Sequence, residues 1–262
     1  MPETKPVAVI TGASAGIGAA LANVFADRGH ALVLVARRAA QLKALADTIE
    51  SRGHARPHVM ALDLGQPGAA GRIEDELREH GLEPQFLVNN AGFGLMGLAA
   101  SLDRAQQLAM IDLNVRVLTE LSLRFAASLA RHKGGILNVA SVASFLPGPG
   151  MAVYHATKAY VLSFSEALHR ELGDEGVRVT ALCPGPVDTE FMALAGIPEG
   201  NFPRFLSRSA ERVAQEGYDG LMRGRRVVIP GSTNKAAAHL ARLMPRWLVL
   251  WMLRVVARPE IK

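Results

Sequence analysis

Two residues with complementary proton chemistry, Tyr154 and Lys158, are four positions apart in a segment whose pattern predicts a helix. At that spacing they share one face of the helix, which places the ammonium group close to the phenol. A free tyrosine titrates near about 10, and a positive neighbour stabilises the phenolate and lowers the pKa. We therefore expect Tyr154 to have a lowered pKa and to exchange a proton with a substrate oxygen.

Two further polar residues stand where they can assist such a proton transfer. Ser141 follows the apolar run 134–140, and its hydroxyl group can hydrogen-bond a substrate oxygen and hold it in place. Asn114 lies in a segment with a helical pattern, where by itself it is better explained as an ordinary polar residue of a helix. The residues around Ser141 lack the glycines of a hydrolase nucleophile elbow, which argues against hydrolytic chemistry at this serine.

A glycine-rich turn stands at the other end of the chain. Gly12, Gly16 and Gly18 follow the apolar run 7–11, and a helical pattern begins near Gly16. Glycines at the end of a strand let the backbone turn sharply, and the amides of the following helix favour the negative charge of a pyrophosphate. The spacing G-x-x-x-G-x-G differs from the more general G-x-G-x-x-G pattern of dinucleotide-binding folds.

The elements that must hold these residues are short apolar runs separated by longer amphipathic segments. The runs are rich in Val, Ile and Leu without polar alternation, as expected for parallel strands that are covered on both faces. Helical patterns between them imply β-α-β crossovers. We therefore predict an α/β fold with a single Rossmann-like domain, in which helices cover both faces of a doubly wound, mostly parallel seven-stranded sheet. The predicted strands are 7–11, 31–36, 58–64, 86–90, 134–140, 177–183 and 226–230.

Four motifs in this order resemble those of the short-chain dehydrogenase/reductase family. TGxxxGIG occupies 11–18, NNAG occupies 89–92, YxxxK occupies 154–158, and Pro184-Gly185 with Thr189 follows the sixth strand. The resemblance extends from about residue 7 to residue 230 and implies a nicotinamide-dependent oxidoreductase. We expect the domain to span 1–234, followed by an extension at 235–262.

The resemblance also implies roles for individual residues. Tyr154 is the expected acid and base, Ser141 orients the substrate oxygen, Lys158 also holds the nicotinamide ribose, and Asn114 supports a water beside the lysine. Asp63 is expected to accept from the adenine amino group, although it can also cap the helix that follows. The expected cofactor contacts of the family motifs are Gly12, Ser14, Gly16, Ile17, Gly18, Asp63, Leu64, Asn90, Ala91, Gly92, Tyr154, Lys158, Pro184, Gly185, Val187 and Thr189.

The choice between NAD(H) and NADP(H) is decided at the end of the second strand. An acidic residue there accepts the ribose hydroxyls of NAD, whereas this chain has Arg37 and Arg38. A guanidinium pairs with phosphate through two donors, so we expect NADP(H), with Arg37 as the first candidate because it directly follows the strand. Ser14 can add a hydroxyl to the same phosphate. The alternative is that both arginines begin a solvated helix.

The substrate loop is expected at 188–208, after the sixth strand. This segment and the residues beside the catalytic motifs carry many apolar side chains, which favour an oxoacyl, steroid-like or aromatic carbonyl compound, although several can simply be core. We expect interconversion of a carbonyl and a secondary alcohol, and the alternative is a cofactor-binding sensor or scaffold protein with incidental catalysis. The apolar residues are Phe93, Leu95, Met96, Phe145, Leu146, Phe191, Met192, Leu194, Ile197, Phe202 and Phe205.

Charge and composition limit the classes of binding partner that we expect for this chain. The formal charge is +5, but residues 223–262 hold 9 basic and 1 acidic residue, so the excess of positive charge lies in the tail. With only 5% aromatic residues and no basic docking face, nucleic acid is not expected as a partner. The start of the chain lacks a signal-peptide pattern, so we expect a cytoplasmic protein. The family resemblance makes a homodimer or homotetramer the expected assembly.

The C-terminal segment predicts a basic amphipathic helix. Arg246, Arg254 and Arg258 fall on one side, and Trp251 belongs to an apolar stripe on the other side. Such a helix can lie on an anionic membrane surface. It can equally pack on the body, cover the substrate entrance or form a dimer interface.

We expect no metal site and no reactive thiol. His54 and His58 are four positions apart, but Pro57 between them interrupts any helix that would align them, so surface histidines are the better interpretation. Cys183 is the single cysteine, and we expect it to pack at the end of a strand.

Overall fold

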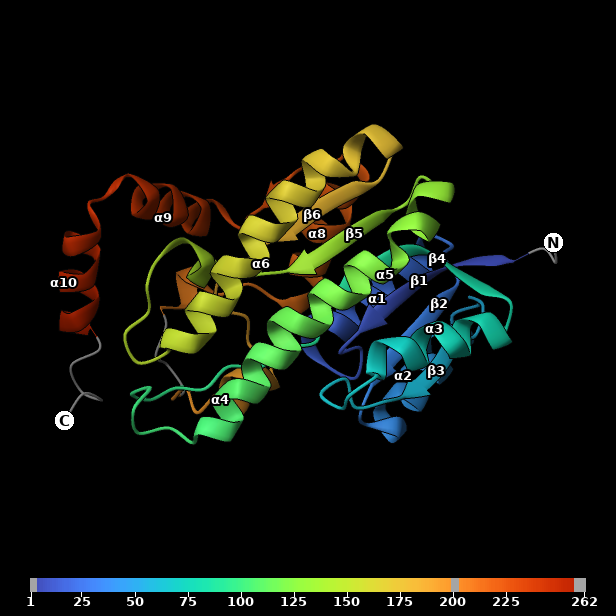
Figure 1. Cartoon of the computed structure of the whole chain (residues 1–262), viewed down its shortest axis with the longest axis horizontal. Helices are drawn as coiled ribbons and strands as arrows, with labels where there is room; N and C mark the ends of the chain where they lie inside the picture. The colour runs from blue at the N-terminus through green and yellow to red at the C-terminus, as the bar shows by residue number, and fades with distance from the viewer. Residues whose placement is uncertain (1–3, 199–202, 257–262) are drawn as a thin grey trace.

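The computed structural model of the protein describes residues 4–198 and 203–256, which form a doubly wound α/β fold (Figure 1). The seven strands pair in the order β3-β2-β1-β4-β5-β6-β7, and every neighbouring pair is parallel. This arrangement confirms the predicted Rossmann-like sheet. The strands are β1 (Lys5–Thr11), β2 (Leu32–Ala36), β3 (His58–Ala61), β4 (Leu82–Asn89), β5 (Gly135–Val139), β6 (Arg178–Leu182) and β7 (Val227–Val228).

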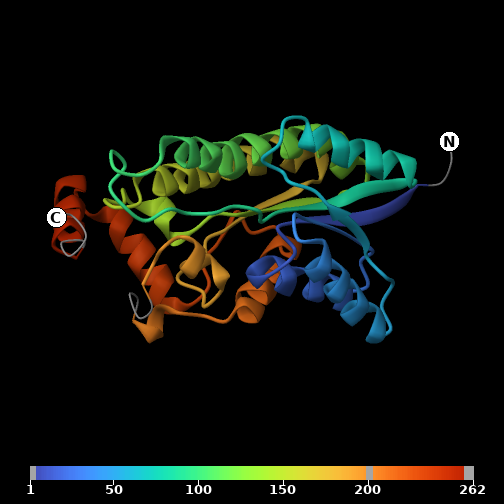
Figure 2. The same ribbon diagram turned by 90° about the horizontal axis from the view of Figure 1, so that it is seen from below.

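Helices cover both faces of the sheet, as Figure 2 shows from the side. One layer contains α1 (Gly16–Asp27), α2 (Ala39–Ser51) and α8 (Ala210–Met222); the other contains α3 (Ala69–Glu79), α5 (Leu118–Arg131) and α6 (Ala152–Glu171). Because strand side chains alternate, β1 contributes to both layers. Ala8 and Ile10 pack with the first layer, while Val7 and Val9 pack with the second.

Two strands, β3 and β7, are each three residues shorter than the sequence predicts, the largest shortening in the sheet. β3 ends at Ala61, because Asp63 accepts a hydrogen bond from the Gly65 amide at 2.9 Å and turns the chain. β7 comprises only Val227 and Val228, since Pro230 has no amide hydrogen to extend the ladder. Each missing strand end becomes a loop at the carboxyl edge of the sheet, where the candidate site lies.

Several shorter elements surround that edge. They include α4 (Arg104–Ile111), a π-helical turn (Asp112–Val117), α7 (Glu190–Leu194), α9 (Ser232–Leu243), α10 (Arg246–Val256) and the 3-10 turns Val142–Phe145, Gly173–Glu175 and Arg204–Leu206. The expected boundary at 234/235 falls inside α9, and Figure 1 places α9 and α10 at one end of the molecule. Within 4–198 and 203–256, no helix has the length and apolar character needed to cross a bilayer.

Candidate active site

The glycine turn joins β1 to α1 as predicted. Gly12 and Gly16 have φ values of 65° and 55°, a backbone region that favours glycine over residues with a Cβ atom. α1 begins at Gly16, and its N-cap residue Ala15 makes no side-chain cap. The first amides of the helix therefore remain available to an anionic group at this end of the sheet.

Gly18 and Asn90 hold the shape of this turn. A Cβ atom on Gly18 would lie 2.3 Å from the Gly12 oxygen and 2.4 Å from Asn90 Nδ2, so no larger residue fits. Asn90 Nδ2 donates to the oxygens of Thr11 and Gly12, at 2.9 and 3.1 Å. Asn90 is an expected cofactor contact, and its side chain supports the glycine turn through these two hydrogen bonds.

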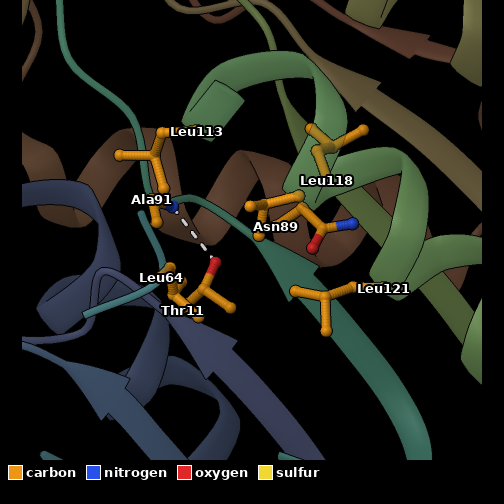
Figure 3. Close-up of a pocket in the computed structure, with 8 residues that line it drawn as sticks. Thr11, Leu64, Asn89, Ala91, Leu113, Leu118 and Leu121 are labelled. Atoms are coloured by element: carbon orange, nitrogen blue, oxygen red, sulfur yellow. Dashed lines mark hydrogen bonds between the residues drawn. The ribbon is translucent and has the colours of Figure 1, made fainter. Parts of the chain in front are cut away.

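Thr11 links β1 to β4, a role that sequence analysis did not assign to it. Its hydroxyl donates to the Val88 oxygen at 3.1 Å and accepts from the Asn90 and Ala91 amides at 3.0 and 3.1 Å. Figure 3 shows a pocket that is lined by Thr11, Leu64 and Ala91. Leu64 and Ala91 are both expected cofactor contacts, so this pocket brings two of them together. The pocket is lined by Thr11, Leu64, Asn89, Ala91, Leu113, Val117, Leu118 and Leu121.

Tyr154 and Ser141 meet at the carboxyl end of β5. Tyr154 lies in α6 and Ser141 directly precedes a 3-10 turn, and each side chain is only 9% exposed. Burial raises the pKa of Tyr154 to about 12, while the nearby hydroxyl group of Ser141 acts in the opposite direction. The expected lowering of this pKa is therefore wrong for the protein by itself, since desolvation of the phenolate outweighs the other contributions.

Lys158 is buried on the same face of α6. Its Nζ atom donates to the Val139 oxygen at 2.7 Å and lies 5.9 Å from the centre of the Tyr154 ring. Burial lowers the pKa of Lys158 to about 8. The predicted proximity of the two side chains is confirmed, but the hydrogen bond to Val139 directs the ammonium group to the backbone.

Asn114 lies in the π-helical turn between α4 and α5. Its Oδ1 atom accepts from the Phe93 amide at 3.1 Å, while Nδ2 donates to the Phe93 oxygen at 2.9 Å and to Thr157 Oγ1 at 3.2 Å. A Cβ atom on Gly92 would lie 2.8 Å from Asn114 Oδ1 and 3.6 Å from Lys158 Nζ. The structure therefore brings Asn114, Gly92 and Lys158 together, and a π-turn is a common device at functional sites.

Arg38, rather than Arg37, faces the glycine turn. Its Nε and Nη2 atoms each donate to Ser14 Oγ at 3.2 Å, and Nη1 forms an ion pair with Glu190 at 2.8 Å. Arg37 is exposed at the end of β2. The structure thus places Arg38 beside Ser14 and leaves Arg37 in solvent, and the contact of either arginine with a 2′-phosphate stays a prediction.

The segment after β6 passes over the glycine turn. A Cβ atom on Gly16 would lie 3.2 Å from Thr189 Cγ2, and Val187 pairs with Arg208 in an isolated parallel bridge. Pro184 accepts from the Val142 amide at 2.9 Å, which ties this segment to the turn beside Ser141. These contacts bring the expected Pro184–Thr189 segment next to both the glycine turn and the catalytic motif.

Two other expected contacts have defined surroundings. Ile17 is half-buried in the first turn of α1 and packs against the core. Asp63 stabilises the turn at Gly65, whereas α3 starts at Ala69 with Gly68 as its N-cap. The alternative role of Asp63 as the cap of that helix is therefore wrong, because the turn separates it from the helix.

Apolar side chains surround Tyr154. Phe93, Leu95, Met151, Val153 and Phe191 pack in one cluster with it, and the Phe191 ring lies 5.6 Å from the tyrosine ring. Sequence analysis missed Met151 and Val153, which precede the tyrosine and could have been found from their position in the motif. The cluster forms an apolar wall beside the phenol.

The other apolar residues of the predicted pocket are dispersed. Leu194 and Phe205 are 72% and 63% exposed, whereas Ile197 is buried. Phe145 lies under the guanidinium of Arg242 in α9, 5.3 Å from its ring centre. Phe202 lies outside the described residues. The substrate loop therefore contributes Phe191 to the Tyr154 cluster but exposes two of its large side chains.

Cys183 and the histidine pair of the sequence analysis have defined surroundings in the structure. Cys183 is fully buried at the end of β6, and burial raises the pKa of its thiol to about 12, which makes it unreactive at neutral pH. His54 pairs with Asp27 at 3.0 Å, whereas His58 lies 2.9 Å from Glu76, so the two histidines form no common site.

Comparison with known proteins is consistent with this geometry. The profile of the short chain dehydrogenase family matches residues 6–197. Sulfoacetaldehyde reductase 2 from Chromohalobacter salexigens is 39% identical over 188 residues, covering 71% of this chain and 74% of that protein.

Two solved structures resemble nearly the whole chain. A short-chain dehydrogenase from Sphingobium yanoikuyae in complex with NADPH has a TM-score of 0.80 and 34% identity, covering 98% of this chain and 96% of that one. The bulky-bulky ketone specific alcohol dehydrogenase from Comamonas testosteroni has a TM-score of 0.75 and 32% identity, covering 99% and 96%. The fold, the ordered motifs and these similarities together show that the chain belongs to the short-chain dehydrogenase/reductase family.

Proposed function

We propose that the protein is an NADP(H)-dependent oxidoreductase that interconverts a carbonyl and a secondary alcohol on an apolar or amphipathic substrate. The observation that carries the proposal is the meeting of Ser141, Tyr154 and Lys158 at the carboxyl edge of the sheet, beside an apolar cluster. A sensor or scaffold would not need a buried phenol beside a serine hydroxyl and a buried ammonium group.

The residues at the glycine turn fit a nicotinamide dinucleotide. The uncapped start of α1 suits its pyrophosphate, and Arg38 with Ser14 supplies three donors suited to a 2′-phosphate. When bound, this cofactor supplies or accepts the hydride. One related structure is a complex with NADPH and another is a complex with NAD, so the preference for NADP(H) rests on Arg38 and Ser14.

Each catalytic residue has one task in carbonyl reduction. Ser141 donates a hydrogen bond to the carbonyl oxygen and holds it beside Tyr154. Tyr154 is protonated at neutral pH, because its pKa is about 12, and it donates that proton to the oxygen as the carbonyl carbon receives the hydride. In the opposite direction the phenolate oxygen of Tyr154 takes the proton from the alcohol. Lys158 places a positive charge near the phenolate that forms on Tyr154.

The wall around Tyr154 favours a bulky apolar carbonyl compound. Phe93, Leu95, Met151, Val153 and Phe191 present hydrocarbon surface, which binds rings or chains better than it binds a sulfonate. The related sulfoacetaldehyde reductase is named for a small charged substrate, whereas the related alcohol dehydrogenase is specific for bulky-bulky ketones. We propose that the substrate of this protein is more similar to a bulky ketone.

The proposal is tested by following NADPH oxidation with a panel of bulky ketones, aromatic aldehydes and sulfoacetaldehyde. We expect turnover with bulky apolar ketones to exceed that with sulfoacetaldehyde. Tight cofactor binding without turnover of any carbonyl compound would instead support the alternative function as a cofactor-binding sensor or scaffold.

Glu190 is expected to weaken the binding of NADPH. Its carboxylate pairs with Arg38 at 2.8 Å, so a 2′-phosphate must compete with it for the guanidinium. Glu190→Gln should tighten NADPH binding by up to about fivefold, the worth of a partly exposed ion pair, and leave NADH binding unchanged. Titration of both cofactors checks this, with the exposed Glu171→Gln on α6 as a control. Equal tightening of NADH would show that Glu190 does not act through the phosphate.

We also propose that α9 and α10 attach the protein to an anionic membrane surface. Both tryptophans of the chain lie on α10, where Trp247 and Trp251 are 70% and 62% exposed beside the exposed Leu243 and Leu250. The exposed Arg246 and the basic C-terminal segment complement anionic headgroups. Val249 of the same helix is buried, so part of the predicted stripe packs on the protein.

Sedimentation with anionic liposomes tests this attachment in the full chain. We expect Trp247→Ala/Trp251→Ala to leave most of the protein in the supernatant at low salt, whereas the parent sediments and is released by high salt. Leu123→Ala, at a 59% exposed position on α5, is the control. A parent that stays in the supernatant refutes membrane docking, and a smaller oligomer for the tryptophan variant would identify a subunit interface.

A further inference from the structure

A second cluster of chemically competent side chains lies far from the catalytic residues, between β3 and α3. His58 is the first residue of β3, while Glu76 and His80 lie one turn apart at the end of α3. One nitrogen of each imidazole and one oxygen of Glu76 all lie within 4.8 Å of one another. The proposed oxidoreductase chemistry uses none of these three residues.

The distances suit a shared ion. His58 Nε2 is 2.9 Å and His80 Nδ1 is 3.7 Å from Glu76 Oε1, and the two imidazole rings have centres 4.5 Å apart. Ligands of a tetrahedral zinc ion, with bonds of about 2.0–2.2 Å, lie about 3.4 Å from one another. Small side-chain rotations therefore convert the present hydrogen-bonded arrangement into a coordination shell.

The donor set and its exposure point to the same ion. Two imidazoles and a carboxylate form a ligand set that zinc accepts, with water completing the tetrahedron. The side chains of His58, Glu76 and His80 are 25%, 36% and 48% exposed, so an ion and its water can enter from solvent. His80 Nδ1 also lies 2.9 Å from the Glu76 backbone oxygen, so an ion bound through Nδ1 replaces this hydrogen bond.

We propose that His58, Glu76 and His80 form a binding site for Zn²⁺. Sequence analysis expected no metal because it compared His58 only with His54, its neighbour along the chain. The fold supplies the other ligands, since the β3–α3 crossover returns the end of α3 to the start of β3. Coordination replaces the hydrogen bond between His58 and Glu76 and joins the two elements.

The position of the proposed Zn²⁺ site determines which property of the protein the ion affects. His58 begins β3 at the amino edge of the sheet, whereas the catalytic residues follow strands at the carboxyl edge. The ion therefore joins the two ends of the crossover that carries Asp63 and Leu64, and it takes no part in the reaction. Its expected effect is to stabilise the folded protein by an amount that rises with the logarithm of the ion concentration above Kd.

Calorimetric titration of the untagged full chain with Zn²⁺ tests the proposal. We expect one ion per chain and a rise in Tm with Zn²⁺ for the parent. His58→Gln, His80→Gln and Glu76→Gln should each weaken binding by about tenfold or more, equal to about 1.4 kcal/mol. His54→Gln is the matched control, because this surface histidine pairs with Asp27 instead. Its affinity should equal that of the parent.

Two further measurements make the result specific to these ligands. Co²⁺ in place of Zn²⁺ should give a visible absorption spectrum that His80→Gln abolishes and His54→Gln retains. Metal-free His80→Gln should oxidise NADPH at the parent rate, so failure of the metal site and failure of the proposed function are distinguishable. Absence of a 1:1 complex in the parent, or equal losses in His54→Gln and His80→Gln, would overturn the proposal.

Discussion

Replacing Tyr154 with phenylalanine should lower carbonyl turnover by about 10²- to 10⁴-fold, the usual contribution of a general acid. The substitution removes the hydroxyl group beside Ser141 but keeps the ring that packs against Phe191. The apolar wall and the glycine turn are therefore preserved, and we expect NADPH still to bind. Steady-state kinetics together with a cofactor titration separate these two quantities.

Tyr160→Phe is the matched control for that experiment. Tyr160 lies on the same helix, is 39% exposed, and its hydroxyl hydrogen-bonds Thr119 at 2.9 Å on the surface. Removing this hydroxyl should leave turnover unchanged. If Tyr154→Phe retained the parent turnover, another group would transfer the proton and the proposed mechanism would be wrong.

Replacing Arg38 with aspartate should weaken NADPH binding by about 10- to 100-fold. A hydrogen bond to a charged group contributes about 1.5–3 kcal/mol, and aspartate would also repel the 2′-phosphate. NADH lacks this phosphate, so its affinity should stay the same or improve. Fluorescence titration of the two reduced cofactors measures the change in preference.

Arg37→Asp provides the comparison, because Arg37 carries the same charge at the adjacent position. The structure directs Arg38 to Ser14 and leaves Arg37 exposed, so we expect a smaller loss of NADPH affinity from Arg37→Asp. A larger loss from Arg37→Asp would restore the order that the sequence suggested. Equal affinities of the parent for NADPH and NADH would refute the preference itself.

The pKa of Tyr154 shows the limit of reasoning from spacing. The i,i+4 pattern correctly predicted that Tyr154 and Lys158 share a helix face, because helix geometry is local. It could not predict how far burial would desolvate each group, since burial depends on elements distant in sequence. In the folded chain, burial raises the pKa of the phenol to about 12 and lowers that of the lysine to about 8.

The sequence by itself determined the α/β class, the parallel sheet, the helix start at Gly16 and the residues brought to the carboxyl edge. Apolar runs, glycine spacing and helical periodicity are local properties, and parallel crossovers place strand ends at one edge. Only the tertiary structure decided that Arg38 faces Ser14 and Glu190, that Asn90 supports the glycine turn, and that His58 meets Glu76 and His80. Those pairings join residues up to 152 positions apart, and packing rather than local pattern selects such partners.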